Sequence, residues 1–192
     1  MGISLLQTPP SDAAQLQYPG GVPDLASYRK TPVYDADCIF YVEQMNAFLA
    51  AAKLDFPESL GASREVATRC GEAKPKGYAL SAMLLASVDK VLEREAAAVA
   101  ELRAGQSAIA VERYRLAHGG ALPSSLDALV PQFLAAVPAD PFDGKPLHYK
   151  PLIPKGFVVY SCGLDKEDNG GAPKPPGAQT GVPFDIPFAV KR

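Results

Sequence analysis

Residues 108–171 read AIAVERYRLAHGGALPSSLDALVPQFLAAVPADPFDGKPLHYKPLIPKGFVVYSCGLDKEDNGG, and this stretch decides the fold. Its helical beginning ends at Gly119-Gly120, which is a strong stop because glycine adopts left-handed backbone conformations without a steric penalty. A short segment that begins with serines follows, then a connector bracketed by Pro131 and Pro138. A turn, two strand-like runs and an oxygen-rich loop complete the stretch. This order predicts a helix that leads into a small sheet.

The turn has the sequence DPFDG at residues 140–144. Pro141 presets φ for the second position of a turn, Asp140 can accept hydrogen bonds from the backbone N–H groups ahead of it, and Gly144 can take a positive φ. Asp140 and Asp143 also resemble a pair of catalytic acids. Because both flank residues that favour a turn, we favour the turn interpretation.

Two runs after the turn have strand patterns, PLHYK at residues 146–150 and GFVVYS at residues 156–161. In the second run, Phe157 and Val159 alternate with Val158 and Tyr160, which predicts an antiparallel hairpin with two distinct faces. Two strands by themselves are marginally stable, so we expect the hairpin to pack on the long helix. Residues 182–188 are predicted to return as a last edge strand.

The longest helical signal spans residues 78–118, which lack proline and are rich in Ala, Leu, Glu and Arg. We expect a kink or a split at Ala104-Gly105, and His118 occupies the last turn, where a cation is favoured. The predicted apolar face consists of Leu80, Met83, Leu84, Val88, Val91, Leu92, Val99, Leu102, Ile109, Val111, Tyr114 and Leu116. A short helix is predicted at residues 122–130, with Ser124 or Ser125 as its cap and Leu126, Leu129 and Val130 facing inward.

The first half of the chain is predicted to be mostly helical. Residues 35–54 form a helix that Asp35 or Asp37 caps, and the apolar stripe that the spacing predicts is Ile39, Phe40, Val42, Met45, Phe48, Leu49 and Ala52. Residues 57–73 are ambiguous; if they are helical, Leu60, Val66 and Cys70 face inward. Residues 1–34 are rich in Pro and Gly and are predicted to be an extended arm, either draped over the body through Leu5, Leu6, Leu16, Tyr18 and Leu25 or disordered.

The expected fold class is therefore α+β, with a helical N-terminal half and a long helix packed on a small antiparallel sheet. We divide the chain into the arm at residues 1–34, a helical region at residues 35–105, and an α+β domain at residues 106–192 that shares the long helix.

Composition sets limits on the function. The 192 residues are 47% hydrophobic and have a formal net charge of −2, so no bulk charge attracts nucleic acid or an anionic membrane. No segment has the run of about 18 uncharged apolar residues that spans a bilayer. The cysteines are Cys38, Cys70 and Cys162, and their spacing is not that of a zinc site. A Cys38–Cys70 disulfide in an oxidising compartment and three buried, reduced thiols remain alternatives.

Residues 108–185 resemble the globular domain of the major pseudopilin of type II secretion, in its G-type form. The motifs that show the resemblance are RYRLAHGGALPSSLDALVP, PADPFDGKPLHY, GFVVYSCGLD, EDNGG and the late FDI. The resemblance implies a long helix packed against a small antiparallel sheet, a loop after the sheet that binds calcium, and a noncatalytic domain that assembles through helix packing. It also implies an extracytoplasmic location in the cell envelope.

The oxygen-rich loop is the candidate metal site. Asp165, Glu167 and Asn169 place side-chain oxygens at alternate positions and Gly170 follows, as in the first half of a calcium loop. Pro176 stands where an EF-hand has its bidentate glutamate, so the loop is not an EF-hand. The resemblance suggests that the remaining ligands are Asp168, Asp185 and a backbone carbonyl such as that of Leu164. A solvated acidic turn is the alternative.

The expected function is protein–protein contact, with another protein or with a second copy, through the surface of the long helix. We expect a periplasmic or other extracytoplasmic location, and membrane association only if an anchor precedes Met1. One alternative is a helical module that binds an apolar ligand between the first helix and the long helix. Another is a hydrolase that uses Asp140, Asp143 and His148, although general acid–base catalysis needs groups that converge on a pocket.

Overall fold

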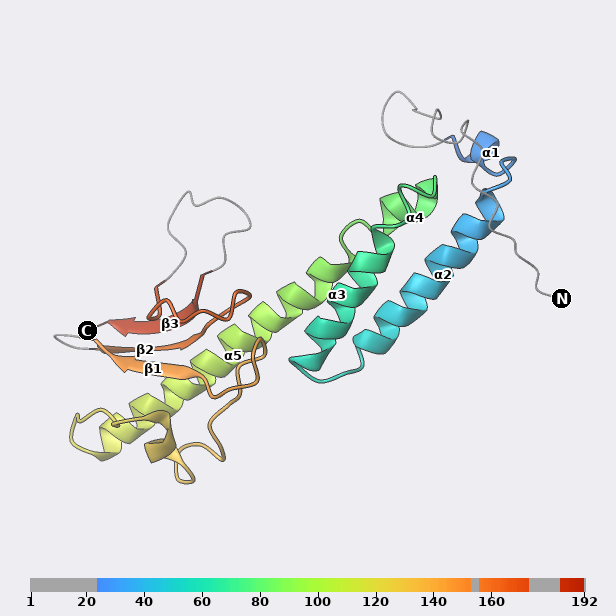
Figure 1. The fold of residues 1–192 in the computed structure, drawn as a ribbon. Coiled ribbons are helices and arrows are strands. Elements are labelled where there is room, and N and C mark those ends of the chain that lie inside the picture. The colour runs from blue at the N-terminus through green and yellow to red at the C-terminus, as the bar shows by residue number, and fades with distance from the viewer. Residues whose placement is uncertain (1–23, 153–155, 173–183, 192) are drawn as a thin grey trace. The chain divides into compact units, whose positions relative to one another are not determined.

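The computed structural model describes residues 24–152, 156–172 and 184–191 (Figure 1). It is a mixed structure of helices and a small three-stranded antiparallel sheet, which confirms the α+β class. The helices are α1 (Leu25–Tyr28), α2 (Tyr34–Ala51), α3 (Glu58–Cys70), α4 (Ala79–Leu84), α5 (Val88–Ala117) and the 3₁₀-helix η2 (Leu126–Leu129). The strands are β1 (His148–Pro151), β2 (Gly156–Ser161) and β3 (Ile186–Lys191).

Contacts within the chain define two compact units. The first unit consists of Met1–Leu54 and Gly61–Val91, and the second consists of Asp55–Leu60 and Leu92–Arg192. This division crosses α5 near its beginning, earlier in the chain than the boundary at residues 105 and 106 that the sequence suggested. The predicted apolar contacts of the arm through Leu5, Leu6, Leu16 and Tyr18 lie outside the described residues.

In the first unit, Asp37 organises the packing of α2. Its side chain is fully buried, and its carboxylate accepts hydrogen bonds from the backbone N–H groups of Leu80, at 2.8 Å, and Ser81, at 3.0 Å. It also accepts bonds from the Ser81 hydroxyl and, at 2.6 Å, from the Tyr28 hydroxyl. Asp37 therefore caps the beginning of α4, which lies forty residues further along the chain. The prediction that Asp35 or Asp37 caps its own helix is wrong, because Val33 occupies that position without a side-chain bond.

The buried face of α2 differs from the predicted stripe. Phe40 and Phe48 are buried as predicted, but Ile39, Val42 and Leu49 are exposed. The buried positions of α2 are Asp37, Phe40, Gln44, Phe48 and Ala51. The prediction failed because α2 is apolar on more than one side, while two polar residues on the inner face have specific partners. Besides Asp37, Gln44 accepts a hydrogen bond from Nε of Arg69 at 3.2 Å.

Two further segments of the first half settle what the sequence left open. The end of the predicted arm is not irregular: α1 begins after Asp24, whose carboxylate accepts a bond from the backbone of Ala26, and Tyr28 is buried. Residues 57–73 are mostly the helix α3, with Leu60, Val66 and Cys70 buried as expected. The three cysteines are free thiols, so the Cys38–Cys70 disulfide is not formed.

The long helical signal divides into α4 and α5 at residues 85–87, and the division predicted at Ala104-Gly105 does not occur. Gly105 lies beside the sheet: a Cβ atom there would be 3.6 Å from the ring of Phe188 on β3, an ordinary van der Waals distance. In the part of the chain that the structure describes, no helix combines the length and apolarity that crossing a bilayer requires.

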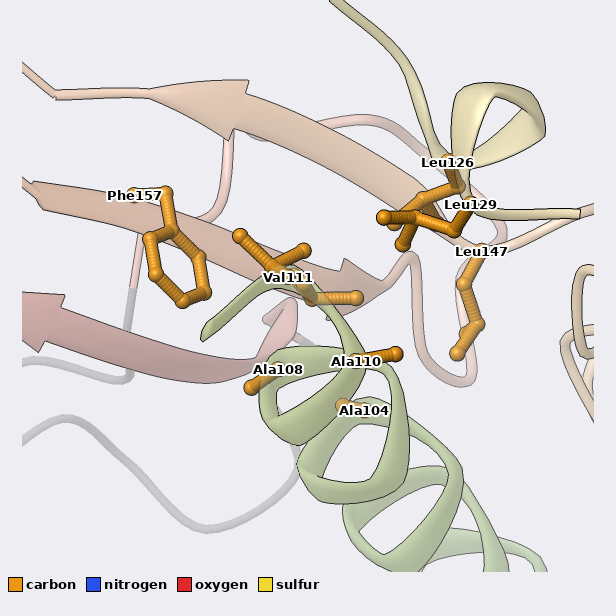
Figure 2. Packing of buried hydrophobic residues seen from close by; sticks show 9 residues of the cluster. Ala104, Ala108, Ala110, Val111, Leu126, Leu129, Leu147 and Phe157 are labelled. Atoms are coloured by element: carbon orange, nitrogen blue, oxygen red, sulfur yellow. The ribbon is translucent and has the colours of Figure 1, made fainter. Parts of the chain in front are cut away.

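The face of α5 that meets the sheet is built mainly from alanine. Figure 2 shows Ala104, Ala108 and Val111 directed towards the sheet, where Phe157 of β2 and the side chains around η2 complete a shared core. Small side chains on this face let the helix approach the strands closely. Several larger residues of the predicted apolar face are exposed, namely Met83, Leu84, Val91, Leu102, Ile109 and Leu116.

The strand order is β1-β2-β3, with both neighbouring pairs antiparallel. β2 has its predicted boundaries, while β3 lies further along the chain than predicted and pairs Val159 with Phe188 and Phe157 with Val190. All six residues of β2 are buried, so both faces of the central strand are covered. The predicted helix at residues 122–130 is shorter, with Leu126 and Leu129 buried but Val130 exposed, and Ser125 precedes it without a side-chain capping bond.

Candidate functional site

The turn at residues 140–144 is fastened to the end of β2. Asp140 is 1% exposed, and its Oδ1 accepts hydrogen bonds from the backbone N–H of Phe142 and from the Ser161 hydroxyl, each at 2.9 Å. Its Oδ2 accepts a bond from the backbone N–H of Cys162 at 2.9 Å. Gly144 takes the positive φ of 77° that the turn predicts. The turn interpretation is confirmed, and the bonds to Ser161 and Cys162 are an additional tertiary contact.

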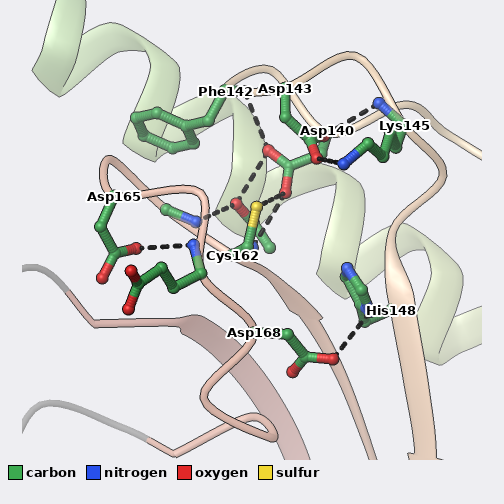
Figure 3. A network of polar contacts seen from close by, with 11 residues as sticks. Asp140, Phe142, Asp143, Lys145, His148, Cys162, Asp165 and Asp168 are labelled. Carbon is green, nitrogen blue, oxygen red and sulfur yellow. Dashed lines mark hydrogen bonds and ion pairs between the residues drawn. The ribbon is translucent and has the colours of Figure 1, made fainter.

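Asp140, Asp143 and Cys162 form a compact cluster, shown in Figure 3. Each offers one ligand atom, and these atoms lie within 4.8 Å of one another. Burial, followed by the charges of Asp140 and Asp143, raises the pKa of the Cys162 thiol to about 12. The thiolate is the form that ligates metals. Asp143 is also engaged, since it accepts the backbone N–H of Lys145 and pairs with its ammonium group at 3.2 Å. As the structure stands, the Asp140 carboxylate in this cluster holds the turn to the end of β2.

The oxygen-rich loop at residues 162–171, called the acidic loop from here on, covers the face of β2 that points away from α5. A Cβ atom on Gly171, where φ is 76°, would lie 2.9 Å from the Tyr160 ring and 3.1 Å from Val158. The loop backbone is held by Asp185, which is 3% exposed and accepts hydrogen bonds from the N–H groups of Asn169, at 3.3 Å, and Gly171, at 2.7 Å. This contact explains why Val158 and Tyr160 are buried although they point away from α5.

The predicted calcium ligands are all placed in or against this loop, but several of their oxygens bind the loop itself. Asp165 accepts the backbone N–H of Glu167 at 3.2 Å, and the Glu167 carbonyl accepts the side-chain amide of Asn169 at 3.3 Å. Leu164 is half-buried, while Glu167, Asp168 and Asn169 are exposed. In residues 24–152, 156–172 and 184–191, the three-ligand cluster of acids and thiol is the one at Asp140, not one in the loop. Calcium binding stays a prediction.

Asp168 connects the loop to the sheet. Its Oδ1 accepts hydrogen bonds from the backbone N–H of Gly170, at 2.8 Å, and from the Tyr160 hydroxyl, at 2.9 Å. These two bonds lower the pKa of Asp168 below its ordinary value. Burial, and then the bond to Asp168, raise the pKa of Tyr160. His148 stacks on Tyr160 with ring centroids 5.0 Å apart and places Nδ1 3.5 Å from Oδ2 of Asp168.

The residues proposed for a hydrolase do not converge. Among the described residues, the carboxylate that pairs with His148 is Asp168, whereas Asp140 and Asp143 hold the turn. Figure 3 shows the two groups as separate sets of contacts. The side chains of His148 and Asp168 are 35% and 50% exposed, so the pair lies at the surface. General acid–base chemistry requires groups that converge on a substrate, and among the described residues His148 is paired with Asp168, not with Asp140 or Asp143.

A hollow of about 330 Å³ lies in the first unit, between the end of α3 and α4. Its lining includes Ala67, Cys70, Lys74, Ser81 and Leu85. The hydroxyl of Ser81 is already bonded to Asp37. The predicted ligand groove was expected between the first helix and the long helix, whereas this hollow lies between α3 and α4, and its volume is at the lower end of the range for small-molecule sites.

An exposed apolar patch lies on α5, on the side opposite its alanine face. We define the α5 patch as Leu102, Ile109 and Leu116, which are 61%, 63% and 72% exposed and recur every seven residues. At 3.6 residues per turn, this spacing puts them on one side of the helix. The sequence placed these residues in the core, and their surface position is what the structure adds.

Comparisons of the chain with family models, with curated proteins and with solved structures found no match. The resemblance to the major pseudopilin therefore depends on the short motifs of residues 108–185. The sequence did not reveal three structural roles. These are the capping of α4 by Asp37, the close approach of Gly171 to the sheet, and the bonds from Asp185 to the loop backbone. The pair Gly170-Gly171 was the available signal for the second, since adjacent glycines mark a tight approach.

Proposed function

We propose that this chain is a noncatalytic interaction domain of a protein of the cell envelope or of a secretion assembly, similar in its second half to a major pseudopilin. The observation that carries the proposal is the α5 patch. Large apolar side chains aligned on one side of a long helix are typical of surfaces that bind protein. The patch agrees with the expectation that the surface of the long helix makes the contact.

The engagement of the acidic residues supports a structural role over a catalytic one. Asp140 is buried and accepts two backbone N–H groups and one hydroxyl, and Asp185 is buried and accepts two backbone N–H groups. Carboxylates used in this way stabilise a fold because a buried charge must be compensated by donors. The two aspartates hold the two segments that flank the end of β2.

Calcium stabilisation of the acidic loop is a second part of the proposal. The loop has oxygen ligands at Asp165, Glu167 and Asn169, and hard oxygen ligands favour calcium over a transition metal. A bound ion would fix the segment that covers Tyr160 and Val158. We expect calcium to raise the thermal midpoint of the chelator-treated protein at millimolar concentration, with magnesium as the control. Calorimetric titration of calcium into the chelator-treated protein is the second measurement. Absence of both a heat of binding and a shift of the thermal midpoint would end this part of the proposal.

The interaction itself can be tested by site-specific photocrosslinking in the native host. A photoreactive residue at Ile109, in the α5 patch, is expected to cross-link to an envelope protein or to another copy of the chain. The matched control is the same residue at Leu49, which is 53% exposed on α2. Equal products from the two positions, or products from neither, would count against the proposal.

A further inference from the structure

The pattern on the exposed side of α5 is symmetric along the chain. Its members occur at intervals of three, four, seven, four and three residues, in the order Glu95, Ala98, Leu102, Ile109, Arg113 and Leu116. All six are exposed. They lie on one side of the helix, because each interval is close to a whole number of turns of 3.6 residues. The midpoint falls between Gly105 and Gln106, so the pattern can match itself when a second helix runs in the opposite direction.

We infer that the partner of this surface is a second copy of the chain, paired with it antiparallel along α5. The inference rests on the proposed function, since it names the occupant of the same patch. In this pairing a two-fold axis passes beside Gly105 and Gln106, as in other interfaces between two identical surfaces. Leu102 of each copy then meets Ile109 of the other, Arg113 lies opposite Ala98, whose small side chain leaves room for it, and Leu116 lies opposite Glu95.

Charge favours the antiparallel direction. Glu95 lies near one end of the pattern and Arg113 near the other, so antiparallel helices bring each Glu95 within one turn of the opposite Arg113. A parallel pair in register would instead place Glu95 beside Glu95 and Arg113 beside Arg113, and like charges at a contact destabilise it. Within its own chain, Arg113 places its guanidinium carbon 5.9 Å from the centroid of the Phe133 ring.

The sheet extends the patch at its centre. Phe188 on β3 is 44% exposed, and its ring lies beside Gly105, where a Cβ atom would be 3.6 Å away. Because Gly105 is next to the midpoint, the two-fold axis brings both Phe188 rings to the same side of the contact. The alanine face of α5 in Figure 2 belongs to the core with the sheet, so pairing leaves that core undisturbed.

The interface is small, because each copy contributes only one side of α5 and the Phe188 side chain. Specific interfaces usually bury about 1,200–2,000 Å² in total, and we place this one at the small end. The dimer is therefore expected to dissociate in the micromolar range. Sedimentation velocity of the full chain from about 1 µM to about 200 µM covers this range. A protein that stays monomeric at the highest concentration would overturn the inference.

Charge exchange tests the register. Arg113→Glu and Glu95→Arg should each weaken self-association about tenfold, because each replaces two opposite-charge contacts with two like-charge contacts. An equimolar mixture of the two variants should recover the association of the unaltered chain, since both contacts in the mixed dimer are again opposite in charge. A mixture that associates no better than its components would exclude this pairing. Both residues are exposed, and circular dichroism checks that the variants fold.

Disulfide cross-linking tests the direction, in a Cys38→Ser background that removes the half-exposed native thiol. A mixture of Leu102→Cys and Ile109→Cys chains should form a mixed cross-linked dimer, while neither variant alone should cross-link well. Parallel pairing would reverse this result, because Leu102→Cys alone would then form the dimer. Leu49→Cys is the control for random collision.

These outcomes separate the inference from the proposed function. A purified chain that stays monomeric but cross-links from Ile109 to a different envelope protein would support the proposed function and overturn self-pairing. A purified chain that pairs as described, without any Ile109-specific product in the cell, would support the pairing and count against the envelope role.

Discussion

Asp37 in the first unit and Asp140 in the second are both buried acceptors of backbone N–H groups, but only the role of Asp140 could be predicted from the sequence. Both are buried and both accept two backbone N–H groups and hydroxyl groups. Asp140 begins its contacts inside a turn whose Pro141 and Gly144 already favour the conformation. Asp37 finds the backbone N–H groups that it caps more than forty residues away, so no neighbouring residue marks its capping role. Local turn chemistry is visible in a sequence, whereas a cap supplied by a distant segment is not.

The largest effect is expected from Asp37→Ala. The substitution removes the acceptor of two buried N–H groups at the beginning of α4 and of the Tyr28 hydroxyl, and we expect a loss of about 3–4 kcal/mol in the free energy of unfolding. Urea denaturation measures the loss, and hydrogen exchange should show α4 amides losing protection first. Asp35→Ala, an exposed change two residues earlier, is the control and should cost less than about 0.5 kcal/mol. Equal losses in the two variants would refute the capping role.

Asp140→Ala should cost less, about 2–3 kcal/mol, because Pro141 and Gly144 still favour the turn after the carboxylate is gone. Its particular signature is at the end of β2, where the Cys162 N–H loses its acceptor. We expect faster hydrogen exchange at Cys162 and unchanged exchange in α2. A loss that equals or exceeds that of Asp37→Ala would show that local turn preference contributes little, which would reverse the comparison.

The same contrast explains which other features were predictable. β2 was placed correctly because its alternation is local, and the turn was found because Pro and Gly set backbone angles by themselves. The inner face of α2 was misjudged because Gln44 is buried through its bond to Arg69, a partner outside the helix. The α5 face was misjudged because alanines form the core there, and hydrophobicity alone favours the larger Leu102 and Ile109. In the acidic loop the sequence located the oxygens, but not their use as acceptors for the loop backbone.

Gly171→Ala should destabilise the protein by about 2–3 kcal/mol through two separate causes, a positive φ and an atom placed 2.9 Å from the Tyr160 ring. Gly119→Ala is the matched control. Gly119 also has a positive φ, of 62°, but a Cβ there would meet nothing within 4 Å. It should cost about 1 kcal/mol, the conformational cost alone. Thermal unfolding of both variants measures the difference. Equal losses in the free energy of unfolding would show that the loop at Gly171 is not in close contact with Tyr160.

The smallest effect concerns the Cys162 thiol, whose ionisation leaves the free energy of unfolding independent of pH around neutrality. Burial first, and then Asp140 and Asp143, raise its pKa to about 12 from an ordinary value of 9.0, so the folded state favours the neutral thiol. This contribution to stability is complete below about pH 9 and is lost as pH rises towards 12. Titration with a thiol reagent at pH 8 should therefore modify the half-exposed Cys38 quickly and Cys162 only on unfolding. Asp140→Ala should accelerate the modification of Cys162, because the carboxylate that fastens its backbone and opposes its ionisation is gone. Fast modification of Cys162 in the unaltered chain would show that the end of β2 opens readily, and that Asp140 holds it less firmly than Asp37 holds α4.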